Sequence, residues 1–492
     1  MAERIHLIPP LRRRIVTPPG GAGHPVWVED PRFELSNHVV RSPLRAPVAW
    51  PDLEAFVGEV AARPLRRDRP LWEMWVVEGL EDGTVALVTK LHHSIMDGGA
   101  GGDLMASLFD LTPSVSEIPV EPVPWRAEKI PSPTSLALRS VLSIPRTMWE
   151  APRAMASIAG SVADTARTWA RQRTTGTAAP LLAPRTILNG VITARRSVSL
   201  NRVDLDRVRE IGREFGTTVN DVVLAATATS LRRYLVAHEA PVPGPLIAAV
   251  PVSVRAPGVS GAGAELGNRV SNMMVPLPLQ PDDPVERLRA VHASAEASKR
   301  LHSAFGPQAL EHLAGFLPPL VAETAGRLYS DLKLARLHPP VFNLIVSNVP
   351  GPPFDLYCAG ARVTGIFPMG PVMEGAALNL TVLSEAHHLN VGIMACPDLV
   401  PFVGEVGDGF VEAVAELAAR ARSARAPFPA ESAGPADSAP GEDAGPADGA
   451  VLVEDAGPAD GAVLAEDAGP ADGAGVEARP PPTVDDWLRR RR

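Results

Sequence analysis

The residues best suited to chemistry are two adjacent histidines, His92 and His93, which open the run HHSIMDG at positions 92–98. An imidazole has an ordinary pKa near neutrality, so it can take the proton of an alcohol that attacks a thioester and return it to the departing thiolate. One histidine can thus serve both steps of acyl transfer without an acyl-enzyme. Asp97 can pair with an arginine and hold the loop, and Gly98 lets the backbone approach closely.

Metal and hydrolase chemistry fit the sequence less well. Adjacent histidines point apart on a strand, and neither an HExxH pattern nor a Cys/His set accompanies them, so we expect no metal site. The nearest run to the GxSxG of serine hydrolases is GVSGA at 258–262, and neither a P-loop nor a GxGxxG occurs. Cys358 and Cys396 form no CxxC pair, which fits a reducing cytoplasm.

The elements that must position the histidines are a hairpin and the loop after it. Residues 71–95 predict two strands around the turn at 81–83, whose glycine suits a positive φ. His92 and His93 then fall at the end of the second strand. The glycine-rich stretch 98–102 follows, and residues 103–111 have helical spacing. We assign residues 1–125 to this first unit.

A second α/β unit is predicted over residues 186–428. Residues 205–215 should form a helix that stops at Gly216, and Thr218 can cap the next helix, which places Asn220 and Asp221 in its first turn. A helical pattern also covers 285–302. Strand-like runs are expected at 246–255, 270–279, 341–349 and 377–395, with a turn at His387 and His388.

The stretch between the units, 126–185, is basic and amphipathic. Its part from Ser135 to Arg173 holds six arginines against two acids, together with tryptophan and methionine. It is either a linker helix across the body or a surface that rests on anionic lipid.

Residues 429–492 form a low-complexity tail. EDAGPADGA repeats with a period of 12 from Glu442, Glu454 and Glu466, and an imperfect copy starts at Glu431. This composition cannot bury enough apolar surface to offset chain entropy, so we expect disorder.

Net charge and hydropathy limit the kinds of partner that we expect this protein to bind. The net charge of -9 belongs to the tail, because residues 431–492 contain 14 acidic and 5 basic side chains and the rest of the chain is balanced. Nothing therefore indicates nucleic-acid binding. The sequence has no signal-peptide pattern and no run of 18 apolar residues, so any membrane contact should be peripheral.

The HHxxxDG run resembles the superfamily of CoA-dependent acyltransferases that includes chloramphenicol acetyltransferase, carnitine acyltransferases and peptide-synthetase condensation domains. Further segments narrow the resemblance to the wax ester synthase/diacylglycerol acyltransferase family, and together they cover about residues 10–425. These segments are PLW at 70–72, VNDVVLA at 219–225, PVSVR at 251–255, GNRVSN at 267–272, SNVPGP at 347–352 and LNLTVLS at 378–384.

The resemblance implies two chloramphenicol-acetyltransferase-like α/β halves with the active site in a channel between them. It makes His93 the base and His92 a supporting residue. Asp97 becomes a structural brace, with Arg255 or Arg269 as its partner. Compared with the family pattern, the chain starts late, so either the recorded start lies downstream of the real one or the first half lacks its first strand and helix, and we expect the strand and helix to be missing from this sequence.

The resemblance also bears on three further sets of residues. Asn220 and Asp221 are expected to brace the two halves, with a direct role in the channel as the alternative. Ser347 and Asn348 are candidate donors to the oxyanion of the tetrahedral intermediate, although a strand end followed by a turn explains them as well. His387 and His388 are assigned to the surface.

The expected reaction joins acyl-CoA and diacylglycerol to give triacylglycerol and CoA, with long-chain fatty alcohols as acceptors for wax esters. Acyl-CoA is then a substrate and no cofactor is required. The expected location is the cytoplasm, in peripheral contact with the plasma membrane or lipid inclusions. Two alternatives stay open: an acyltransferase that uses a carrier-protein thioester, and a non-catalytic coat protein of lipid inclusions.

Overall fold

The structure, a computed structural model of the chain, describes residues 3–19, 24–95, 107–114, 129–138, 183–253, 270–305 and 319–425. The predicted tail at 429–492 and most of the predicted linker at 126–185 lie outside these ranges. In the part of the chain that the structure describes, no helix is long and apolar enough to cross a membrane.

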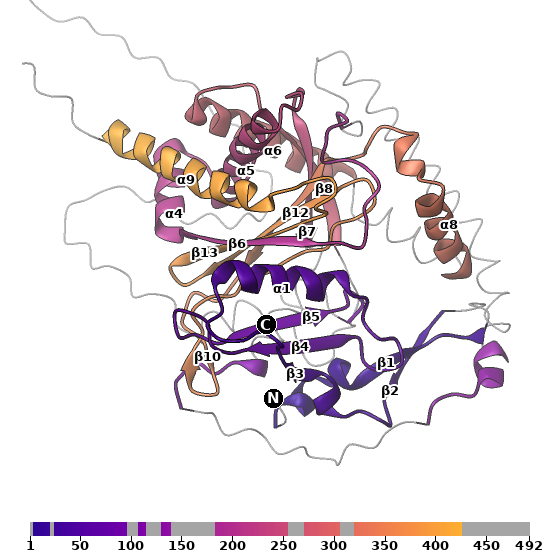
Figure 1. The fold of residues 1–492 in the computed structure, drawn as a ribbon. Helices are drawn as coiled ribbons and strands as arrows, with labels where there is room; N and C mark the ends of the chain where they lie inside the picture. The colour runs from indigo at the N-terminus through magenta and orange to yellow at the C-terminus, as the bar shows by residue number, and fades with distance from the viewer. Residues whose placement is uncertain are drawn as a thin grey trace, which may run out of the picture.

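The N-terminal half is built on a three-stranded sheet in the order β3-β4-β5. Strand β3 runs parallel to β4, and β4 and β5 form the predicted antiparallel hairpin, with Gly83 at φ 76° in its turn. Helix α1 lies between this sheet and the larger sheet of the other half (Figure 1). The elements are β1 (Arg13–Val16), β2 (Val26–Glu29), β3 (Val39–Arg41), α1 (Trp50–Ala62), β4 (Trp72–Val77) and β5 (Ala86–Leu91), with 3-10 turns at Ile5–Leu7, Pro9–Arg12 and Leu35–Asn37.

The C-terminal half contains a six-stranded mixed sheet in the order β6-β13-β12-β9-β7-β8. Strand β9 runs parallel to both β12 and β7, and the other pairs are antiparallel. Its strands are β6 (Ser197–Asp204), β7 (Leu246–Ser253), β8 (Val270–Leu277), β9 (Leu344–Pro350), β12 (Leu378–Glu385) and β13 (His388–Ala395). A short hairpin of β10 (Tyr357–Cys358) and β11 (Ala361–Arg362) extends from this half.

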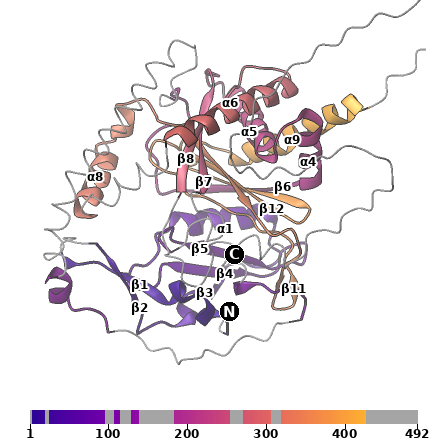
Figure 2. The same ribbon diagram turned by 180° about the vertical axis from the view of Figure 1, so that it is seen from behind.

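Helices cover the face of the six-stranded sheet that is turned away from the N-terminal half (Figures 1 and 2). They are α4 (Leu205–Phe215), α5 (Val219–Ala237), α6 (Pro284–Phe305) and α9 (Val403–Arg425). Helix α8 (Pro319–Asp331), followed by a 3-10 turn at Leu334–Arg336, stands apart from this layer in both views.

Local signals set the helix ends as predicted. Helix α4 ends before Gly216, which adopts φ 65°, a left-handed conformation that glycine reaches at low cost. Thr218 caps α5 through a capping box with Asp221. The strand-like run 377–395 is two strands joined by a turn, with His387 in the turn and His388 as the first, exposed residue of β13.

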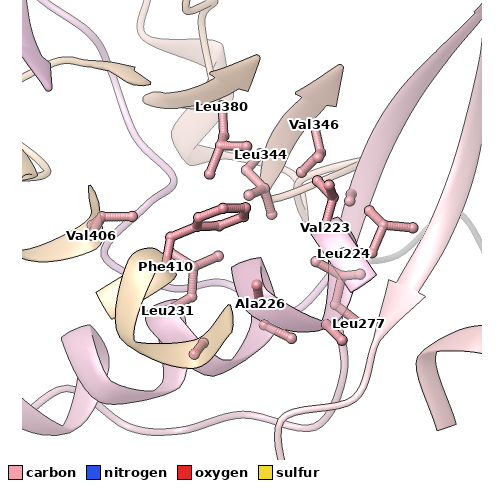
Figure 3. Close-up of a cluster of buried hydrophobic side chains, with 14 of the residues drawn as sticks. Val223, Leu224, Ala226, Leu231, Leu277, Leu344, Val346, Leu380, Val406 and Phe410 are labelled. Carbon is pink, nitrogen blue, oxygen red and sulfur yellow. The ribbon is translucent and has the colours of Figure 1, made fainter. Parts of the chain in front are cut away.

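The main core lies between the six-stranded sheet and its helices. Alternate residues of the central strands point into it, so that Leu344 and Val346 of β9 and Leu380 of β12 meet Phe410 of α9 (Figure 3). This face of the sheet is therefore fixed by hydrophobic burial.

The two halves share a second, smaller core. Leu53, Phe56, Val57 and Val60 of α1 pack with Val198 of β6, and Met369 and Met394 of the C-terminal half pack against the same cluster. The two halves also exchange backbone hydrogen bonds, since Asp110 and Tyr357 donate to each other's carbonyls at 2.7 and 2.8 Å. The N-terminal half is therefore joined to the C-terminal half by both apolar packing and strand pairing.

Candidate active site

The predicted catalytic histidines lie in a tight turn directly after β5. Strand β5 ends at Leu91, and the backbone N–H of His92 donates to the carbonyl of Leu71 (3.0 Å). The N–H of Ile95 then donates to the carbonyl of His92 (2.9 Å), which closes the turn. The side chains of His92 and His93 are exposed, whereas that of Ile95 is buried. The turn thus presents both imidazoles while its end is anchored in the protein.

The anchor is a small core beneath the hairpin. Ile95 packs in one cluster with Ile8, Leu11, Leu71, Trp72 and Met74. Burial of apolar side chains on both sides of the histidine pair holds the turn against the hairpin.

Trp72 of this core makes specific contacts with Leu11 and His38. Its indole Nε1 donates to the carbonyl of Leu11 (2.8 Å), and its ring stacks on His38 with centroids 4.6 Å apart. Nδ1 of His38 in turn lies 2.8 Å from the carbonyl oxygen of Trp72. The PLW segment therefore supports the start of β4, and Leu71, directly before this strand, positions His92 through its carbonyl. Sequence reasoning missed Leu11 and His38, because no local pattern marks them as partners of Trp72.

The hydrogen bonds of His92 indicate its tautomer. The backbone N–H of Ser94 donates to Nδ1 of His92 (3.1 Å), and the Ser94 hydroxyl lies 2.7 Å from the same nitrogen. Nδ1 is therefore an acceptor, which places the proton of the neutral ring on Nε2. The accepting nitrogen of His92 is thus engaged inside its own turn.

Electrostatics also favour a neutral His92. Partial burial is the main cause that lowers its pKa, and the positive charges of Arg67 and His93 lower it further. His92 is thus uncharged over a wider pH range than a free imidazole.

Four residues that sequence reasoning assigned to the site cannot be placed. Asp97 and Gly98, and the candidate partners Arg255 and Arg269, lie outside the described residues.

The candidate oxyanion donors Ser347 and Asn348 lie side by side on β9 and point to opposite faces of the sheet. Leu344 and Val346 face the main core, so Asn348 shares their face by the period of two. Ser347 faces the other way, beside Thr381 of β12 in parallel register. The two side chains therefore cannot line one common wall.

The face that carries Ser347 is turned toward the N-terminal half. Asn379 and Thr381 share this face, and their neighbour across the sheet, Met394, packs against the core that contains α1. The Thr381 hydroxyl donates to Oδ1 of Asn379 (2.8 Å), whose amide donates to the carbonyl of Pro371 (3.0 Å). Ser347 thus belongs to a polar strip of the sheet between the halves.

The glycine after β9 serves close backbone packing. A Cβ built on Gly351 would lie 2.2 Å from the carbonyl oxygen of Ser384, so a side chain there would force β9 and β12 apart. This contact supports the reading of SNVPGP as a strand end and a turn.

Asp221 occupies a fully buried position at the start of α5. Its Oδ2 accepts from the backbone N–H and the hydroxyl of Thr218 (2.9 and 2.8 Å) and lies 2.8 Å from Nδ1 of His292 on α6. The other carboxylate oxygen has no hydrogen-bond partner among the described residues. Asp221 therefore braces α5 against α6 inside the C-terminal half, and the expected contact with the N-terminal half stays a prediction. Asn220 beside it is half-buried.

Comparisons with known proteins match both halves of the chain. The model of the wax ester synthase/diacylglycerol acyltransferase catalytic domain matches residues 1–223, and that of the C-terminal domain of the same family matches residues 266–418. The chain belongs to the wax ester synthase/diacylglycerol acyltransferase family. It is accordingly an acyltransferase.

Relatives support the assignment over most of the chain. A Mycobacterium tuberculosis protein with the assigned name diacylglycerol O-acyltransferase is 36% identical over 420 residues, which cover 85% of this chain and 81% of the relative. A second protein of that name and organism is 36% identical over 433 residues, covering 86% and 89% of the two chains.

A solved member of the family has the same architecture. The wax ester synthase/diacylglycerol acyltransferase of Marinobacter aquaeolei VT8 is 27% identical and superposes with a TM-score of 0.59, covering 84% of this chain and 86% of that one. The predicted two-half α/β fold of the family is therefore confirmed. In this acyltransferase, the His92–His93 turn and the PLW support lie in the part matched by the catalytic-domain model, and so does Asp221.

Proposed function

We propose that this acyltransferase moves a long-chain acyl group from acyl-CoA to the hydroxyl of diacylglycerol, with His93 as general base. His93 takes the hydroxyl proton while the oxygen attacks the thioester carbonyl. The tetrahedral intermediate then expels the CoA thiolate, which receives the same proton. The products are triacylglycerol and CoA. Long-chain fatty alcohols are alternative acceptors, and they give wax esters.

The observation that carries the choice of His93 is the hydrogen bonding of its neighbour. Nδ1 of His92 accepts from Ser94 within the turn, which suits a supporting residue that stabilises the turn. His93 is the next residue, and its ring is exposed at the surface of the turn.

The remaining roles in the proposal follow the motif. Asp97 braces the loop after the histidines, and Gly98 allows close approach of the backbone. Ser347, on the sheet face turned toward the N-terminal half, is the candidate donor to the oxyanion.

Replacement of the two histidines tests the mechanism. His93→Ala should lower kcat by roughly 10²- to 10⁴-fold, the usual contribution of a general base, and His92→Ala should have a milder effect. His93→Ala should keep the melting temperature of the wild type, because its side chain is exposed, whereas His92→Ala should lower it slightly by removing the acceptor of the Ser94 N–H. Full activity of a folded His93→Ala protein would exclude the mechanism, and the reverse order of effects would exchange the two roles.

One product assay separates the alternatives on substrate. Palmitoyl-CoA is offered with diolein and hexadecanol in competition, and CoA release is followed together with the lipid products. Triacylglycerol as the main product supports the proposed acceptor. A coat protein would release no CoA, and an enzyme that uses a carrier-protein thioester would release product only from a carrier-bound donor.

Contact with lipid is the last part of the proposal. The acceptor is insoluble, and the basic, amphipathic stretch 135–173 is the segment of the sequence best suited to an anionic lipid surface. The protein should sediment with anionic vesicles and be released as salt rises. Replacing Arg146, Arg153 and Arg167 by Glu should abolish this binding and spare turnover on a detergent-dispersed acceptor.

A further inference from the structure

A cationic loop lies next to the histidine turn. It connects α1 to β4 and spans residues 63–71, with Asp68 as its single acidic residue. Its basic residues are Arg63, Arg66, Arg67 and Arg69. Such a density of arginine on one connection favours the binding of an anion.

One end of this loop is bonded to β5 and the other to the histidine turn. At the first end, the ammonium group of Lys90 on β5 donates to the carbonyls of Val60 (2.8 Å) and Arg63. At the other end, the carbonyl of Leu71 accepts from the backbone N–H of His92 (3.0 Å). The loop that carries the arginines is therefore fixed next to the histidine turn by hydrogen bonds at both of its ends.

Three of the four arginines already have partners. Arg66 makes two hydrogen bonds to the Asp68 carboxylate (3.1 and 2.6 Å). Arg69 donates to the carbonyl of Asn37 (3.2 Å). Arg63 donates to the carbonyl of Glu59 (3.3 Å) and lies over the ring of Trp75.

Arg67 differs from these three. Its side chain is exposed, and no hydrogen bond or ion pair to another described residue is assigned to it. It nevertheless lies within electrostatic reach of His92, because its charge is one of the causes that lower the pKa of that histidine. The loop thus holds one guanidinium, that of Arg67, which has no partner among the described residues and acts electrostatically on His92.

We propose that the arginine loop binds the phosphate groups of the CoA donor, and that Arg67 supplies the phosphate-binding guanidinium. This inference rests on the proposed function, which requires acyl-CoA at the histidine turn. CoA carries a diphosphate and a 3′-phosphate at the end of its pantetheine arm. A guanidinium is planar, always charged and suited to two parallel hydrogen bonds to phosphate oxygens. Arg67 is a binding residue in this scheme and takes no part in proton transfer.

Truncated donors separate phosphate binding from any effect on the histidines. Arg67→Ala should raise the KM for palmitoyl-CoA roughly 10- to 100-fold, the range for loss of a hydrogen bond to a charged group, with little change in kcat. The KM for S-palmitoyl-pantetheine, which has no phosphate, should stay at the wild-type value. Palmitoyl-3′-dephospho-CoA then shows which phosphate Arg67 contacts. If Arg67→Ala still raises the KM for this donor, Arg67 contacts the diphosphate, and if the KM no longer rises, Arg67 contacts the 3′-phosphate.

The matched control is Arg41→Ala. Arg41 is an exposed arginine of the same half that pairs with Glu78 (2.8 Å), so its removal changes the net charge equally without touching the loop. It should leave the KM for both donors unchanged. An equal rise in KM for Arg41→Ala and Arg67→Ala would show only long-range electrostatic attraction and would overturn the proposal. The proposal would also be overturned if Arg67→Ala raised the KM for S-palmitoyl-pantetheine as much as the KM for palmitoyl-CoA.

Direct binding supplies a readout that needs no turnover. Titration calorimetry with CoA should show a weaker Kd for Arg67→Ala and a still weaker one for Arg67→Glu, and the difference from the wild type should shrink as salt rises. Equal Kd values would overturn the proposal. Inorganic phosphate and anionic vesicles serve as competitors, and displacement of CoA by vesicles alone would assign the loop to a lipid headgroup instead. A wild-type protein that binds CoA through Arg67 but transfers no acyl group would contradict the proposed function and leave this inference standing.

Discussion

Nδ1 of His292 on α6 lies 2.8 Å from Oδ2 of Asp221 on α5, and the carboxylate of Asp221 is fully buried. The same oxygen accepts the two hydrogen bonds from Thr218 that cap α5. One carboxylate therefore caps the start of α5 and ties it to α6, which gives the aspartate a structural task inside the C-terminal half.

Removal of the imidazole tests this task. His292→Ala leaves the buried Asp221 carboxylate without one of its partners, so we expect the free energy of unfolding to fall by about 1–3 kcal/mol. Turnover per folded molecule should stay near the wild-type value. The measurement is urea unfolding followed by circular dichroism. Lys299→Ala on the same helix is the control, because its exposed pair with Glu296 should contribute under about 1 kcal/mol.

Two tryptophans of β4 allow a matched test of the PLW support. Trp72→Phe removes the hydrogen bond from the indole to the carbonyl of Leu11, so it should lower the free energy of unfolding by about 1–3 kcal/mol beyond the loss of ring volume. Trp75→Phe removes a similar volume, but the buried Nε1 of Trp75 has no acceptor among the described residues. Equal destabilisation of the two variants would show that the bond to Leu11 contributes nothing.

His38 should make stability depend on pH. Burial is the main cause that lowers its pKa below the ordinary 6.5, and the bond to the carbonyl of Trp72 opposes this shift. The folded protein therefore binds the proton less readily than the unfolded chain. The free energy of unfolding should rise as the pH increases from the pKa of His38 in the folded protein to the ordinary value of 6.5. Below the folded pKa, His38 is protonated in both states, and the loss of stability caused by protonating it in the folded protein is complete.

The variant His38→Gln isolates this contribution. Glutamine keeps a donor for the Trp72 carbonyl and does not titrate, so the acid-side loss should be smaller than in the wild type. Thermal melting between about pH 5 and about pH 8 measures the difference. Parallel curves for the two proteins would assign the loss to other groups.

Glu54 should couple the two halves. Its Oε1 accepts from the backbone N–H of Leu200 on the edge strand β6 (2.6 Å). The carbonyl oxygen of Leu200 lies 3.4 Å from the indole nitrogen of Trp50. Two side chains of α1 thus occupy the open edge of the larger sheet. Glu54→Ala leaves the Leu200 N–H without its acceptor and should cost about 1–3 kcal/mol.

The conservative variant Glu54→Gln should behave differently. Burial raises the pKa of Glu54 above its ordinary 4.5, more than the bond to Leu200 lowers it. A carboxyl with a raised folded pKa favours the folded state at low pH, and this stabilisation is lost as pH rises through the folded pKa. The amide keeps the acceptor without the charge, so Glu54→Gln should be at least as stable as the wild type near neutral pH. Lower stability than that of Glu54→Ala in calorimetry would refute the role of the acceptor.

Local signals in the sequence determined much of this protein. The glycine at 216 and the capping threonine at 218 fixed the ends of α4 and α5, because caps act over three or four residues. Alternating apolar residues around a glycine turn gave the hairpin that ends at His92. The family motifs predicted the two-half fold, because they can be read along the chain and their order matches that of a family with this fold.

Tertiary structure alone decided which distant residues complete each group. Trp72 meets a carbonyl 61 residues away, and Asp221 meets an imidazole 71 residues away. The strand period separates Ser347 from Asn348, but only the packing of Met394 against α1 shows which of the two faces the N-terminal half. The electrostatic effect of Arg67 on His92 likewise depends on the fold, which brings the connection between α1 and β4 to the histidine turn. Sequence separation does not determine distance in space, so only the tertiary fold shows which of these residues are partners.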